Sequence, residues 1–110
     1  MIKVDGNKLI TDTNVLEFDN KILEAVEYNN LYVVVFDTDF DDGFDNVYCY
    51  KENKELLWRI SPASTFAGRA RSTYVGVNLI NDVCSVVDFF GRRFTIDMKN
   101  GNLLHMEIVK

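Results

Sequence analysis

Turn-forming residues divide this chain into short apolar runs, and their spacing limits the folds that it can adopt. Clusters rich in Asp, Asn and Gly recur about every 8–12 residues between runs rich in Val, Ile, Leu, Tyr and Phe. The clusters lie at residues 5–7, 19–20, 29–30, 52–54, 81–82, 91 and 99–101. This spacing is typical of an antiparallel all-β meander. The 110 residues match the size of one domain, so we expect a single all-β domain over residues 1–110.

Two segments carry clear strand patterns. The run Leu31–Phe36 is continuous and rich in β-branched residues, which predicts a central strand covered on both faces. Near the C-terminus, Leu104, Met106 and Ile108 alternate with polar residues. This period of two predicts a half-buried strand with the three apolar side chains on its core face. The preceding Asn100-Gly101 pair indicates a hairpin turn.

The segment 20–28 fits two structures. Asn20 could cap a helix that has Ile22, Leu23 and Val26 on one face. The same residues also suit a strand that leads through a turn into the next strand. We predict the strand.

A sequence repeat with a period of about 46 residues organises the chain. Residues 47–58 form the first copy, and residues 93–104 form the second. Each copy reads as a short strand, a polar turn and a second strand that opens with Leu-Leu. We expect two sheets with one copy each, spanning roughly residues 22–60 and 74–109.

The repeat resembles the blade of quinoprotein-type β-propellers, whose outer hairpin reads hydrophobic–Tyr–x–x–Asp–x–x–Thr/Asn–Gly–x–x–Leu–Trp. The stretches Tyr48–Trp58 and Phe94–Leu104 match it. The resemblance implies blade-like antiparallel sheets. A closed propeller needs at least about four blades, so two copies predict two packed sheets or an incomplete propeller. The cofactor residues of quinoproteins have no counterpart here, and we expect no cofactor.

The alternation of apolar and polar residues also predicts the core. We expect nine side chains to be mostly buried: Val33, Val35, Val47, Trp58, Val86, Phe94, Ile96, Leu104 and Ile108. Asp88 lies close to Arg92 and Arg93, and we expect these charges to form weak surface pairs.

Charge and targeting signals limit the classes of partner. Seventeen acidic and twelve basic residues give a net charge of −5, which argues against nucleic acids and anionic membranes and suits a basic protein. No apolar run approaches the roughly 20 residues of a membrane span. The stretch Met1–Gly6 does not resemble a signal peptide. We therefore expect a cytoplasmic protein.

Few residues are suited to catalysis or metal binding. Cys49 and Cys84 lie within apolar segments, so we expect two reduced, buried thiols, with a disulfide as the alternative. Zinc is not expected, because the one histidine, His105, and two separated cysteines lack ligand spacing. No nucleophile–base motif is present, and we expect binding rather than enzymatic activity.

The segment 37–45 concentrates the negative charge. It contains seven candidate partner-binding residues: Asp37, Asp39, Phe40, Asp41, Asp42, Phe44 and Asp45. On a protein interface, the carboxylates would steer a basic partner and the two phenylalanines would supply buried area. A solvated hairpin loop is the alternative. The next candidate surface is the aperiodic segment Ser61–Ser72 with its two arginines, Arg69 and Arg71.

Calcium binding is a third interpretation of segment 37–45. Asp37, Asp39 and Asp41 alternate as in an EF-hand loop. However, Gly43 occupies the seventh position instead of the sixth, and Tyr48 stands where the bidentate glutamate belongs. We therefore expect no metal.

The layout of the whole chain resembles bacterial immunity proteins of polymorphic and contact-dependent growth inhibition toxin systems. The likeness lies in the segments NVYCYKENKELLWRI and IDMKNGNLLHMEI, residues 46–60 and 96–108. It implies a cytoplasmic antitoxin that binds and blocks one toxin domain, and a basic nuclease would suit the acidic surface. The alternative is a non-catalytic protein-binding or scaffold module of a cytoplasmic complex.

Overall fold

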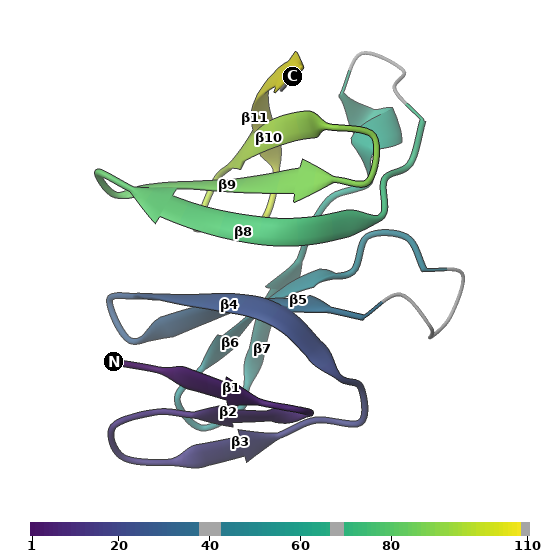
Figure 1. The fold of residues 1–110 in the computed structure, drawn as a ribbon. Coiled ribbons are helices and arrows are strands. Elements are labelled where there is room, and N and C mark those ends of the chain that lie inside the picture. Colours follow the sequence, from purple (N-terminus) through teal and green to yellow (C-terminus); the bar gives the residue numbers. More distant parts are fainter. Residues whose placement is uncertain (38–42, 67–69, 109–110) are drawn as a thin grey trace.

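The computed structural model describes residues 1–37, 43–66 and 70–108 and forms three open antiparallel sheets (Figure 1). The all-β class predicted from the turn spacing is confirmed. Within the described residues the only helical element is a 3₁₀ turn, η1, at Ala63–Thr65. No helix in this part of the chain is long and apolar enough to cross a membrane.

Each sheet joins strands that are consecutive along the chain. The N-terminal sheet contains β1 (Lys3–Asp5), β2 (Lys8–Ile10) and β3 (Val15–Glu17). The middle sheet contains β4 (Ile22–Tyr28), β5 (Leu31–Phe36), β6 (Val47–Lys51) and β7 (Leu56–Arg59). The C-terminal sheet contains β8 (Tyr74–Ile80), β9 (Val83–Asp88), β10 (Arg92–Ile96) and β11 (Leu103–Ile108).

The two sequence repeats fall in different sheets, as expected. The middle sheet includes residues 47–58, and the C-terminal sheet includes residues 93–104. The ambiguous segment 20–28 forms β4, so the strand prediction is confirmed. The separate N-terminal sheet was not predicted, because strands of three residues are too short to show an alternation.

Strand β5 is buried on both faces, which confirms the prediction from its continuous apolar run. Val33 and Val35 face the core between the middle and C-terminal sheets. Tyr32, Val34 and Phe36 face a second core beneath the N-terminal sheet. The middle sheet therefore lies between the other two sheets (Figure 1), and β5 contributes to both cores.

Trp58 connects the two repeats across the larger core. Its side chain is buried, as predicted, and its indole Nε1 donates a hydrogen bond to the Met98 carbonyl at 2.8 Å. Gly101, in the turn before β11, lies directly against the indole ring. A residue of the first repeat is thus held by the turn of the second.

The predicted core is correct at seven of its nine positions and wrong at Leu104 and Ile108, which are 57% and 58% exposed. Thr95 pairs with His105, but Ile96 pairs with Leu103, so Leu104 is the extra residue of a β-bulge. The bulge reverses the alternation, because it adds one residue to one strand only. Leu103 therefore packs against the core in place of Leu104. Ile108 is the last residue of this edge strand.

Cys49 and Cys84 are buried free thiols in the larger core, which confirms the reduced state predicted from their apolar surroundings. Burial raises the pKa of the Cys49 thiol to about 11 and that of Cys84 to about 12. Both thiols are therefore protonated at neutral pH, and the reactive thiolate is scarce.

Two glycine substitutions should separate backbone strain from steric overlap. A Cβ at Gly101 would lie 2.6 Å from Cε3 of Trp58, whereas one at Gly6 would meet nothing within 4 Å. Both glycines have positive φ, of +77° and +61°. Gly6→Ala should lower the free energy of unfolding by about 1–2 kcal/mol, the cost of left-handed backbone. Gly101→Ala should lose about 1–3 kcal/mol more, because the indole must move. Urea denaturation measures both losses, and equal losses would contradict the close approach.

Candidate functional site

Three connections gather at one end of the molecule, which we call the loop end. The described parts are Asp37 and residues 43–46 of the β5–β6 connection, residues 60–66 and 70–73 of the β7–β8 connection, and residues 89–91 between β9 and β10 (Figure 1). The first two contain the two segments that the sequence singled out as candidate surfaces. The structure therefore brings the described parts of both candidates together and adds a third segment.

Hydrogen bonds between the three connections fix their relative positions. The backbone N–H of Asp45 donates to the Ser72 carbonyl at 2.9 Å, and the Thr73 hydroxyl donates to the Gly43 carbonyl at 2.9 Å. The N–H of Phe89 donates to the Thr73 carbonyl at 2.8 Å. The connection between β7 and β8 is thus hydrogen-bonded to both of the other connections.

The structure describes only part of the predicted acidic surface. Four of the seven candidates, as well as Arg69 of the neighbouring segment, lie outside the described residues: Asp39, Phe40, Asp41 and Asp42. The other three candidates are at the loop end. Asp37 is half-buried, and its N–H donates to the Lys21 carbonyl at 2.8 Å.

The buried carboxylate of Asp45 forms an ion pair with the exposed Arg71 side chain of another connection. The residue is 3% exposed, and its Oδ2 accepts hydrogen bonds from Nη2 of Arg71 at 2.8 Å and from Nε at 3.1 Å. The Arg71 guanidinium also lies 4.9 Å from the centre of the Phe44 ring. Asp45 and Phe44 therefore hold Arg71 in place, a local role that their position in an acidic cluster did not reveal.

The neighbouring Asn46 joins the middle sheet to the C-terminal sheet. Its fully buried amide Nδ2 donates to the carbonyls of Phe36 and Tyr74, each at 2.7 Å. Its Oδ1 accepts a hydrogen bond from the Tyr74 N–H, also at 2.7 Å. One side chain thus connects the end of β5 to the start of β8.

Asp88 and Arg92 form a buried ion pair, so the surface pair expected from the sequence is wrong. The Asp88 side chain is 0% exposed, and that of Arg92 is 14% exposed. Arg92 Nε donates to Asp88 Oδ2 at 2.7 Å, and the Ser72 hydroxyl donates to the same oxygen at 2.7 Å. The local sequence could not show this burial, because Ser72 comes from a distant loop. Arg93 instead forms the exposed pair, with Glu107 at 3.2 Å.

Phe89 and Phe90 project from the turn that this ion pair supports. Their exposed fractions are 73% and 74%, and their rings meet edge to face at 5.6 Å between centres. Asp88 Oδ1 accepts the Phe90 N–H at 3.0 Å, so the backbone is held while the rings face solvent. Sequence analysis missed this pair. The sequence signal was the pair of adjacent phenylalanines before Gly91. Adjacent residues of a strand point to opposite faces, so the two rings could not both face one core.

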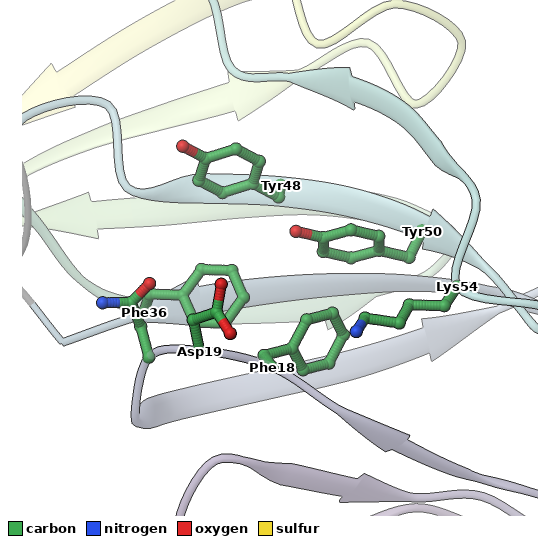
Figure 2. A pocket seen from close by; sticks show the side chains of 7 residues that line it. Phe18, Asp19, Phe36, Tyr48, Tyr50 and Lys54 are labelled. Carbon is green, nitrogen blue, oxygen red and sulfur yellow. The ribbon is translucent and has the colours of Figure 1, made fainter.

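An aromatic cleft of about 300 Å³ adjoins the loop end (Figure 2). Its lining comes from β5, β6, the β6–β7 turn and the segment after β3: Phe18, Asp19, Asn20, Phe36, Tyr48, Tyr50 and Lys54. The Tyr48 and Tyr50 rings are nearly parallel, with centres 6.2 Å apart. Burial raises the pKa of the Tyr50 phenol to about 12, so it is neutral. No motif in the sequence pointed to this cleft, because its residues come from distant segments.

Arg59 connects the cleft to the loop end. Its guanidinium lies 5.2 Å from the centre of the Tyr48 ring. The same group donates hydrogen bonds to the carbonyls of Phe44 at 3.0 Å and Asp45 at 2.9 Å. On the other strand, Phe36 lines the cleft and is followed directly by Asp37. The two features therefore form one continuous region.

A polar cluster joins the N-terminal sheet to the middle sheet. The Glu52 carboxylate accepts hydrogen bonds from the hydroxyls of Thr11, Thr13 and Tyr32, and the Thr11 bond measures 2.7 Å. These donors lower the pKa of Glu52. Every polar group in this cluster has a structural partner, so we assign it to stability. Within the described residues, no group of three or more His, Cys, Asp or Glu side chains could hold a metal ion.

Removing the Asp88 carboxylate should destabilise the protein far more than removing an exposed one. Asp88→Ala leaves the buried Arg92 guanidinium without its counter-ion, so the free energy of unfolding should fall by about 3–5 kcal/mol. The matched variant Glu107→Ala breaks the exposed pair with Arg93, where a loss of about 0–1 kcal/mol is expected. Urea denaturation followed by tryptophan fluorescence gives both values. Similar losses of unfolding free energy in the two variants would contradict a larger contribution from the buried Asp88–Arg92 pair than from the exposed one.

Comparison with known proteins identifies the family but assigns no activity. A search of curated proteins finds no match. A family model described as "Domain of unknown function (DUF7957)" matches residues 1–108. Because the match extends over nearly the whole chain, the protein belongs to the DUF7957 family.

Proposed function

We propose that this protein is a non-catalytic binding domain that contacts a protein partner through its loop end. The observation that supports this proposal is the exposure of Phe89 and Phe90 on a rigid turn. Large exposed aromatic side chains are typical anchors of protein interfaces. A turn held by the buried Asp88 loses little conformational freedom on binding, because it is already ordered.

The charge of the chain favours a basic partner. The net charge is −5, and five carboxylates lie within the segment 37–45. Asp45 pairs with Arg71, and the other carboxylates of this segment, Asp37, Asp39, Asp41 and Asp42, are the proposed steering charges. Such charges accelerate encounter with an oppositely charged surface. The loop end thus combines aromatic anchors with a neighbouring acidic segment.

The specific form of this proposal is a bacterial immunity protein. The resemblance of residues 46–60 and 96–108 to immunity proteins supports it. In that role the domain would act in the cytoplasm and would cover the active site of a toxin, for which a basic nuclease has suitable charge. In this role the partner would be a toxin domain encoded by a neighbouring gene. Blocking would be by occlusion, so the domain itself needs no catalytic group.

Replacing the two exposed phenylalanines should abolish binding. The double variant Phe89→Ser with Phe90→Ser should weaken affinity by about 2 kcal/mol or more for each ring. The matched control, Ile80→Ser with Val83→Ser, removes two side chains that are 60% and 50% exposed. The control pair flanks the β8–β9 turn, at the far end of the same hairpin (Figure 1), and should bind normally. Calorimetry with the candidate toxin domain measures affinity, and equal losses in both variants would contradict a loop-end interface.

Neutralising the acidic segment should slow association without changing the fold. The triple variant Asp39→Asn, Asp41→Asn and Asp42→Asn should bind more slowly and depend less on salt, because exposed charges are screened beyond about 8–10 Å at physiological ionic strength. Stopped-flow association at two salt concentrations measures this change, and far-UV circular dichroism checks the fold. If the rate and its salt dependence are unchanged, the segment is a solvated hairpin loop and does not steer the partner.

A further inference from the structure

The aromatic cleft beside the loop end has the size and lining of a pocket for one long side chain. Phe18 and Phe36 are 6% and 4% exposed, and Tyr48 and Tyr50 are half-buried. Together they border a space of about 300 Å³. Figure 2 shows both phenol hydroxyls pointing to the same side of the cleft, away from Lys54. The walls are therefore aromatic, with polar atoms along one side.

The rings of this cleft already hold cations of the chain itself. The Lys54 Nζ lies 5.4 Å from the centre of the Phe18 ring, and the Arg59 guanidinium lies 5.2 Å from that of Tyr48. Aromatic faces attract cations because their electron density gives them a negative potential. Of these two cations only Lys54 lines the cleft, and both contacts show that its rings accept positive charge.

The two cations differ in how firmly they are held. Arg59 is fixed by hydrogen bonds to two backbone carbonyls. Lys54 is exposed, lies in the turn between β6 and β7, and forms no ion pair or hydrogen bond with another described side chain. Among the described residues, only the Phe18 ring contacts its ammonium, and a lysine side chain moves into water at little cost. Lys54 is therefore replaceable.

Asp19 supplies a negative charge at the same cleft. It lines the space, it is exposed, and its carboxylate makes no ion pair or hydrogen bond within the described residues. A carboxylate binds a guanidinium through two parallel hydrogen bonds, and the planar guanidinium also stacks on aromatic rings. An anionic ligand would be repelled by Asp19. A neutral ligand could pack against the rings but would form no ion pair with Asp19.

We propose that the cleft binds an arginine side chain of the basic partner, which displaces Lys54, stacks beside Tyr50 and pairs with Asp19. This inference rests on the proposed function, because the partner reaches the cleft from the loop end. Arg59 and Phe36 make the two regions continuous. Lys54 acts as an internal substitute for the incoming cation in the unbound protein.

Titration with a capped amino acid tests the cleft without the partner. N-acetyl-arginine methylamide is added to ¹⁵N-labelled protein, and chemical shifts are followed by NMR, with N-acetyl-glutamate methylamide and methyl glucoside as separate probes. The arginine probe should shift the amides of Tyr48 and Tyr50 and bind more tightly than the other probes. Lys54→Met should tighten arginine binding about threefold or more, because the competing cation is gone. Asp19→Asn should weaken it about fivefold, as expected for one exposed ion pair.

The direction in which Lys54→Met changes the affinity for the arginine probe tests the proposal most directly. If Lys54→Met weakens arginine binding, or if the glutamate or glucoside probe binds more tightly than arginine, the cleft is not an arginine pocket. The matched control is Lys51→Met, which removes the same charge from a residue paired with Glu55 at 3.0 Å and should change arginine binding little. Dispersed amide spectra confirm that each variant folds.

The two proposals can fail separately. Arginine binding to the cleft combined with normal toxin binding by the Phe89 and Phe90 variant would overturn the proposed function alone. Loss of toxin binding by that variant without arginine binding to the wild-type cleft would overturn this inference alone. The affinity of the Asp19→Asn variant for the toxin connects the two proposals. If a partner arginine occupies the cleft, this affinity must be lower than that of the wild type.

Discussion

The buried amide of Asn46 is the interaction on which the arrangement of the sheets depends. It provides both a donor and an acceptor to Tyr74, as a neighbouring strand would, and a second donor bond to Phe36. Leaving one of these buried backbone groups without a partner would cost about 1–3 kcal/mol. The amide therefore fixes where β8 begins relative to β5. The three connections of the loop end take their positions from that junction.

The turn spacing and the sequence repeat were sufficient to predict much of the fold. The all-β class, the two repeat-containing sheets and the double burial of β5 depend on local patterns that a sequence displays. The bulge at Leu104 and the three-residue strands of the N-terminal sheet have no such pattern. One added residue reverses the faces of a strand, and very short strands cannot show a period.

The candidate site was predictable only in part, because charge in a sequence does not reveal burial. Asp45 belongs to an acidic cluster, yet it pairs with Arg71 from another loop. Asp88 is covered because Ser72 reaches it from the same loop. Buried ion pairs often add little net stability. The Asp88 carboxylate also accepts the Phe90 N–H, so it holds the backbone of a turn whose aromatic residues face solvent.

The double burial of β5 has a consequence for how its pairing is specified. In most strands a slip of one residue moves apolar side chains into water, and that penalty maintains the alignment. In β5 such a slip would exchange Val33 and Val35 with Tyr32 and Val34, between two equally apolar environments. Burial of apolar side chains alone therefore hardly distinguishes the correct register of β5 from one shifted by a residue. Discrimination must come from side-chain volume and from polar contacts at either end of the strand, which Tyr32 makes with Glu52 and the Phe36 carbonyl makes with Asn46.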